Sequence, residues 1–287
     1  MPWPLKRFFH MPKLSITSFD VPTIWTGLGI WDACEWNGSS IPAPRQNLLK
    51  RLLSWLKKPV SLEQEHLDTA DAVGRSFIEK LRPHPCYGGM DLAAINDLTA
   101  FVLAWPIKDD VYLYPWFWLP EDDLAGRSKH DNVRYDLWAE QGFLELTPGA
   151  VTDWRFVTAR IKQLARIFKI RQIGFDRYGA RDTVADLMEV GIEVVDTGQG
   201  FVSMNAPCRR MEELVLSKHL VHTGHPVLRW NADCTTTAQD PAGNIKLVKP
   251  NRQSGSKRID GMVASVMAID CIMKNTKKSM TPGCIAL

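Results

Sequence analysis

The order of strands and helices that the sequence predicts favours an α/β fold built around a mixed sheet. Three strands follow one another directly between residues 87 and 120. Helices and strands then alternate from residue 153, and a final helix begins at residue 258. Strands joined in direct succession pair antiparallel, whereas a strand that returns after a helix runs parallel to its neighbour. The sheet should therefore be mixed and carry helices on both faces.

The composition is that of an ordinary globular protein. The chain has 287 residues, of which 45% are apolar and 23% charged, with a net charge of +3. That charge neither requires nor excludes a polyanionic partner. The six cysteines form no CxxC pair and follow no secretory signal, so we expect reduced thiols in a cytoplasmic protein. No stretch approaches the roughly 20 apolar residues of a membrane span, so no membrane association is expected.

The first 85 residues differ from the rest and predict a mainly helical N-terminal segment. Scattered Trp, Pro and Gly precede two amphipathic stretches, at 46–58 and 61–81, and "RPHPC" then ends the second helix. We therefore place a boundary near Pro85. Residues 1–85 are expected to form a linker or helical segment, 86–274 the α/β domain, and 275–287 a basic flexible tail.

Each strand and helix of the α/β domain has its own signal. Strands are predicted at 87–92, 98–105 and 111–120, and Pro115 places the third at an edge or a bulge. An amphipathic helix at 153–169 precedes a strand at 170–176. The remaining elements are helix 180–191, strand 192–198, helix 206–220, a hairpin from 226–238 with 244–249, and helix 258–274. This order is the pattern of ribonuclease H-like folds.

Three aspartates occupy positions where packing alone would not require a carboxylate. Asp91 stands in an apolar first strand, where a buried carboxylate is costly unless it is paired or binds a cation. Asp176 ends the strand 170–176, at the edge of an open α/β sheet where sites are built. Asp260 lies in the first turn of the last helix, on its apolar face. Aspartates at strand ends and in first turns are also common caps and turn formers.

Convergence of these three carboxylates at one end of the sheet would favour a metal site. Without a cation they would repel one another, whereas Mg²⁺ and Mn²⁺ prefer oxygen ligands. Two such ions about 4 Å apart are the usual machinery for attack of water on a phosphodiester. Gly88 and Gly89 would let a phosphate backbone approach the first strand.

Two further features would suit such a site. Asp97 is either a fourth acid near the metals or a turn former between the first two strands. The stretch "IKLVKPNRQSGSKR" contains no acid and runs into Asp260, so it predicts a loop that grips phosphate, although a solvated charged loop has the same composition. Its basic residues are Lys246, Lys249, Arg252, Lys257 and Arg258.

At this point the sequence resembles a known family. The blocks "CYGGMDLAAINDLTA", "PWFWLPEDDL", "YDLWAEQGFLELTPG", "IGFDRYGA", "LVLSKHLVHTGHPVLRW", "DPAGNIKLVK" and "KRIDGMVASVMA" follow in the order seen in large terminase subunits of tailed bacteriophages. The resemblance covers about residues 86–272, the nuclease domain of that family. It implies Asp91, Asp176 and Asp260 as ligands of two Mg²⁺ or Mn²⁺ ions.

The resemblance also implies a function and partners. A metal-dependent endonuclease would cut concatemeric viral DNA during packaging, in the cytoplasm of the bacterial host, with the small terminase subunit and the portal protein as partners. The sequence contains no GxxxxGK[ST] loop, so we do not expect ATP-driven translocation by this chain alone. The alternative is an inactive prophage remnant that only binds DNA or assists assembly. A nucleotide-binding domain of similar fold would need glycine-rich phosphate loops, for which "GGMD" is a thin match.

Overall fold

A computed structural model describes residues 70–92, 98–176, 181–250 and 257–280, which form one compact unit. Its main sheet has the strand order β4-β3-β2-β1-β5-β6, and β7 pairs with a second stretch of β3. The strands are β1 (Pro85–Asp91), β2 (Thr99–Ile107), β3 (Asp110–Pro120), β4 (Glu145–Thr147), β5 (Lys169–Phe175), β6 (Glu193–Asp196) and β7 (Leu220–His222).

The sheet is mixed, as the sequence predicts. β1, β2 and β3 pair antiparallel in succession, and the β5 and β6 pairings with their neighbours are parallel. On its outer side β3 pairs with β7 at residues 111–113 and with β4 at residues 118–120. Pro115 lies between these two stretches, where β3 has no strand partner on its outer side among the described residues.

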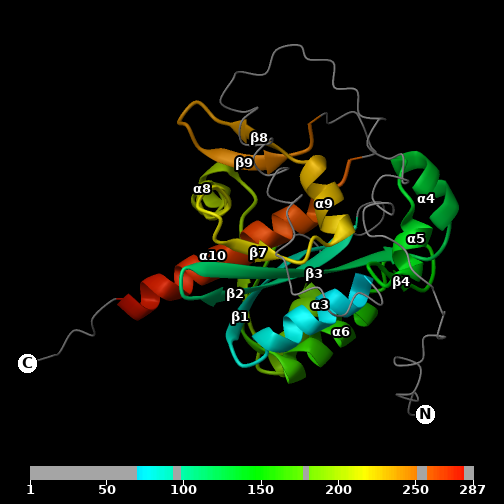
Figure 1. Ribbon diagram of the computed structural model, residues 1–287, viewed down its shortest axis with the longest axis horizontal. Helices are drawn as coiled ribbons and strands as arrows, with labels where there is room; N and C mark the ends of the chain where they lie inside the picture. The colour runs from blue at the N-terminus through cyan, green and yellow to red at the C-terminus, as the bar shows by residue number, and fades with distance from the viewer. Residues whose placement is uncertain (1–69, 93–97, 177–180, 251–256, 281–287) are drawn as a thin grey trace, which may run out of the picture. The chain divides into compact units, whose positions relative to one another are not determined.

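Helices cover both faces of the sheet (Figure 1). One face packs against α3 (Ala70–Leu81) and α6 (Trp154–Ile167), and the other against α8 (Phe201–Leu216), α9 (Pro226–Asp233) and α10 (Asp260–Met280). This is the ribonuclease H-like arrangement expected from the element order. α3 contributes Phe77 and Leu81 to the core, so in the structure it packs with the domain whose start was expected after Pro85.

Several local predictions were wrong or incomplete. Residues 226–233, expected in a strand, form α9, and the hairpin is shorter: β8 (Thr236–Gln239) with β9 (Ile245–Val248). α8 begins at Phe201 and contains Pro207 instead of starting beside it. α10 continues to Met280, so residues 275–280 are helical and do not belong to a flexible tail. The sequence reading also missed two short helices, α4 (Leu124–Asp131) and α5 (Tyr135–Glu140).

Two glycines let α10 lie close against the sheet. A Cβ added at Gly89 in β1 would lie 1.9 Å from the carbonyl oxygen of Ala264 and 2.6 Å from the nitrogen of Ala268. A Cβ at Gly174 in β5 would lie 3.0 Å from the sulfur of Cys271. The helix backbone therefore rests directly on β1 and β5, which fixes the place of its first residue, Asp260. No helix among the described residues is long and apolar enough to cross a membrane.

Candidate functional site

Strand register places Asp91 and Asp176 next to each other. β1 and β5 run parallel with Met90 opposite Phe175, so the residues that follow, Asp91 and Asp176, stand at the carboxyl ends of adjacent strands. Gly89, two residues before Asp91, faces α10. Because side chains alternate along a strand, Asp91 points to the same face, and both carboxylates are half-buried. This end of the sheet is where open α/β folds place their sites.

Asp260 begins α10 and is 6% exposed. The first turn of the helix is fixed by its neighbours. The N–H of Gly261 donates to Oδ1 of Asn231 in α9 at 2.8 Å, and the carbonyl oxygen of Ile259 accepts from Met262 and Val263. The positive end of the helix dipole favours a carboxylate at this position.

The first turn of α10 lies over the same end of the sheet as Asp91. Asp91 is opposite Ala100 in β2, and Ala100 is opposite Phe117 in β3, so the three form a row across the sheet. A Cβ added at Gly261 would lie 2.6 Å from the ring of Phe117. Asp260 therefore begins its helix above the row that contains Asp91.

The donor set suits a hard divalent cation, because it consists of carboxylate oxygens alone. The carboxylates are not, however, gathered to a point. Within the described part of the chain, no three His, Cys, Asp or Glu side chains lie close enough together to hold a metal ion. Asp91 and Asp260 also interact with other groups of the protein. The fourth predicted acid, Asp97, lies outside the described residues.

The predicted phosphate-gripping stretch divides into two parts. Lys246 lies on β9 with its ammonium 4.8 Å from the centre of the Phe201 ring, and Lys249 follows the strand. Both side chains are half-buried, as is that of Lys257. Arg252 lies outside the described residues. Two of the basic residues thus belong to the hairpin, and Lys257 lies three positions before Asp260.

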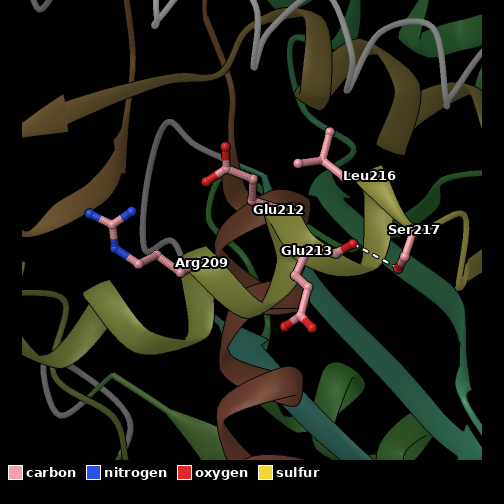
Figure 2. Close-up of a pocket in the computed structure, with 5 residues that line it drawn as sticks. All are labelled: Arg209, Glu212, Glu213, Leu216 and Ser217. Carbon is pink, nitrogen blue, oxygen red and sulfur yellow. Dashed lines mark hydrogen bonds between the residues drawn. The ribbon is translucent and has the colours of Figure 1, made fainter.

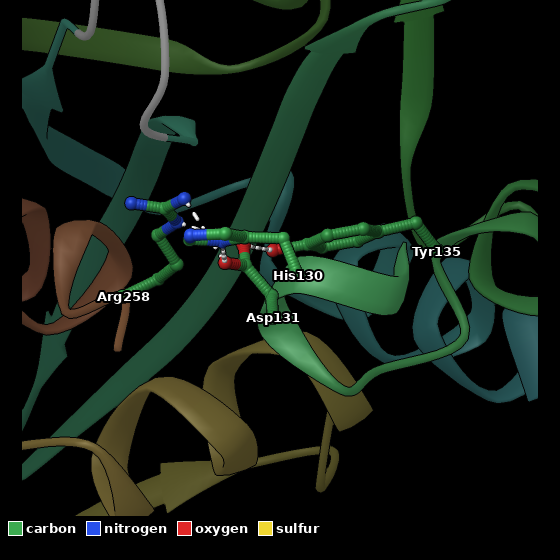
Figure 3. Close-up of polar contacts among 4 residues, drawn as sticks. All are labelled: His130, Asp131, Tyr135 and Arg258. Carbon is green, nitrogen blue, oxygen red and sulfur yellow. Dashed lines mark hydrogen bonds and ion pairs between the residues drawn. The ribbon is translucent and has the colours of Figure 1, made fainter. Parts of the chain in front are cut away.

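The prediction that Arg258 contacts DNA does not fit the structure. Its side chain is only 9% exposed, and its guanidinium forms a two-pronged ion pair with Asp131 at the end of α4 (Figure 3). A guanidinium held by a buried carboxylate is poorly placed to reach a phosphate in solvent. Nothing local in the sequence revealed this partner, because the two residues are 127 positions apart.

The role expected for Gly88 and Gly89 also needs correction. Gly89 faces the backbone of α10, and Gly88 faces the side chains of Ile173 and Phe101 on the opposite side of the sheet. The glycines therefore make room for protein packing and not for a phosphate backbone.

A shallow pocket lies on the outer surface of α8 (Figure 2). Arg209, Glu212, Glu213, Leu216 and Ser217 line it, and the Ser217 hydroxyl donates to the backbone carbonyl of Glu213 at 2.8 Å. None of the predicted metal ligands lines this pocket. The candidate site is therefore the sheet end that carries Asp91 and Asp176, and the pocket is no part of it.

Comparison with known proteins identifies the family. The endonuclease domain of the terminase large subunit matches residues 62–275. The chain belongs to this family. It is 38% identical over 190 residues to the terminase large subunit of Enterobacteria phage HK97, a match that covers 65% of this chain and 37% of that protein. It is 27% identical over 210 residues to protein YmfN of Escherichia coli K12, covering 70% of this chain and 46% of that protein.

The fold agrees with a solved relative. The crystal structure of the HK97 large terminase superposes with a TM-score of 0.60 at 37% identity, over 66% of this chain and 40% of that chain. This terminase nuclease domain thus spans less than half of the length of the relatives it matches. The fold of this chain, a mixed sheet with helices on both faces, thus agrees with its family membership.

Proposed function

We propose that this terminase nuclease domain is a divalent-metal-dependent DNA endonuclease in which Asp91, Asp176 and Asp260 hold two Mg²⁺ or Mn²⁺ ions. The observation that carries the proposal is the register of β1 and β5, which supports a position of Asp91 beside Asp176 at the end of the sheet over which α10 begins. Membership of the terminase endonuclease family supports the same chemistry.

The protein's own groups would divide the work. Bound ions would supply activation of the attacking water and stabilisation of the leaving 3′ oxygen. Asp91 and Asp176 would provide oxygen ligands from rigid strand ends, and Asp260 would provide a third from a helix terminus. The close contact of α10 with Gly89 and Gly174 would hold that third ligand against the sheet.

The substrate we propose is double-stranded DNA, gripped through its phosphates. Lys246, Lys249 and Lys257 are half-buried and precede Asp260 in the sequence, and Arg252 belongs to the same basic stretch. Their contribution would fall with rising salt, because binding releases counterions from the DNA. By family membership, the biological reaction would be the cutting of concatemeric phage DNA during packaging in the host cytoplasm, with the small terminase subunit and the portal protein as partners.

A plasmid cleavage assay with EDTA, Mg²⁺ or Mn²⁺ tests the proposal. Asp91→Asn should lower the rate by at least about 10²-fold, because loss of metal-based charge stabilisation is worth several kcal/mol. Asp109→Asn is the matched control, since this exposed aspartate lies in the turn after β2, at the opposite end of the sheet. Equal cleavage by both variants would remove Asp91 from the site.

A second candidate function is DNA binding without cutting, as expected of an inactive prophage remnant. The observation that favours it is that the described carboxylates are not gathered to metal-binding distances. If the folded protein binds DNA but cleaves no plasmid with any divalent metal, this second function replaces the first.

A further inference from the structure

The segment that carries Asp260 is tied to the protein on both sides of that residue. On the C-terminal side, the N–H of Gly261 donates to Asn231, which is fully buried in α9. On the N-terminal side, Arg258 is bonded to Asp131 at the end of α4. Asp260 is therefore held between two fixed points that come from different helices.

The Arg258–Asp131 pair is well built. Nε of Arg258 lies 3.0 Å from Oδ2 of Asp131, and Nη2 lies 3.1 Å from Oδ1, so the two groups meet through two parallel bonds. Oδ2 also accepts a 2.6 Å bond from the hydroxyl of Tyr135, and Nδ1 of His130 lies 2.7 Å from Oδ1 (Figure 3). A two-pronged pair fixes direction as well as distance.

The pair is also buried, which makes it costly to open. The side chain of Asp131 is 2% exposed and that of Arg258 is 9% exposed. Breaking one partner would leave the other as an unpaired buried charge. Burial raises the pKa of Tyr135 above its ordinary value, so its hydroxyl stays a donor to Asp131 at neutral pH.

We propose that Arg258 is a positioning residue for Asp260: its pair with Asp131, completed by Tyr135, fixes the start of α10 so that the Asp260 carboxylate can ligate metal. This inference rests on the proposed metal site. It assigns Arg258 a role in metal binding, where its sequence position two residues before Asp260 suggested a contact with DNA.

Metal and DNA binding by the full chain separate these two roles. We expect Asp131→Asn and Arg258→Gln each to raise the Kd for Mn²⁺ in calorimetry by about 10-fold or more, as losses of supporting contacts do at other metal sites. Neither change should weaken binding of a fluorescent DNA duplex in EDTA. A phosphate-gripping Arg258 would behave differently: Arg258→Gln would weaken DNA binding, whereas Asp131→Asn would release the guanidinium and leave DNA binding intact or tighter.

Two milder variants guard against simple unfolding. Tyr135→Phe removes one donor to Asp131 and should raise the Kd for Mn²⁺ less than Asp131→Asn does. Arg258→Lys keeps the charge but not the fork, so it should recover part of the metal affinity that Arg258→Gln loses.

Glu145→Gln is the matched control. Glu145 accepts from Trp118 at 2.9 Å and pairs with Arg160 at 2.8 Å, so it repeats the Asp131 pattern on the opposite face of the sheet. This variant should leave Mn²⁺ binding at the wild-type value. The inference fails if folded Asp131→Asn and Tyr135→Phe bind Mn²⁺ as the wild type does, or if Glu145→Gln weakens binding equally. If the wild type itself neither binds Mn²⁺ nor cuts plasmid, the proposed function fails and the inference with it.

Discussion

The two faces of the sheet pack against their helices in different ways above β1 and β5. On the α6 side, large aromatic side chains fill the space, and Trp105 meets Phe168 edge to face with ring centres 5.5 Å apart. On the α10 side, Gly89 in β1 and Gly174 in β5 have no side chains, so the backbone of α10 lies directly against the two strands. At β1 and β5 the first face is therefore a layer of apolar side chains, and the second is a direct contact between helix backbone and strands.

Buried ionisable groups are also distributed unequally between the faces. The α10 side contains Asp260, His225 and the Arg258–Asp131 pair, whereas the ion pair on the α6 side, Glu145 with Arg160, is about a quarter exposed. Buried polar groups are costly unless they are satisfied, so they concentrate where function requires them. Both faces therefore contribute an apolar core, and the α10 side, which has the larger cluster, also contains the buried charged groups.

A methyl group added to each face tests this comparison most strongly. Gly89→Ala places a Cβ against the backbone of Ala264 and Ala268, which cannot move aside, and should lower the free energy of unfolding by about 3 kcal/mol or more. Gly88→Ala meets Cγ1 of Ile173 and the ring of Phe101 at 2.9 Å; side chains can adjust more than backbone can, so this change should cost less, about 1–2 kcal/mol. Urea unfolding measures both. Equal losses would mean that the helix contact is no tighter than the aromatic layer.

Divalent metal should stabilise the α10 side. A ligand that binds only the folded state at 100 times its Kd adds about 2.7 kcal/mol to the free energy of unfolding. We expect this gain with Mn²⁺ in the wild type and in Asp109→Asn, but not in Asp91→Asn. The same denaturation curves recorded with Mn²⁺ and with EDTA give the answer. A gain that survives in Asp91→Asn would place the bound metal elsewhere.

Acid should weaken the α10 side through His225. Burial lowers the pKa of this histidine from 6.5 to about 3, and its ring packs against Phe117 and Phe143. The unfolded chain takes up a proton below pH 6.5 while the folded chain does not, so stability falls as pH drops from about 6.5 towards 3. Between pH 7 and 5 the loss attributable to His225 should be about 2 kcal/mol.

Unfolding free energies of His225→Gln at both pH values test this expectation, with His84→Gln, a half-buried histidine beside β1, as control. The His225 variant should lose about 2 kcal/mol less than the wild type over this range. An equal loss in wild type and His225→Gln would show that the ring does not stay neutral through burial.

Local pattern in the sequence determined much of this protein. Runs of apolar residues specify the long strands β2 and β3, and apolar positions at helical spacing specify α6, because these side chains must be removed from water. Asp91, Asp176 and Asp260 could be singled out because a carboxylate in an apolar stretch, at a strand end or on an apolar helix face needs a reason.

The tertiary structure decided what depends on distant partners. Residues 226–233 were predicted as a strand, yet they form α9, whose Asn231 accepts from Gly261 at the start of α10, 30 positions away. Gly88 and Gly89 look alike in the sequence but meet opposite faces of the sheet. Arg258 was predicted to bind phosphate, but in the structure it pairs with the carboxylate of Asp131, 127 positions away. Such pairings carry no local pattern, because only the folded chain brings the two groups together.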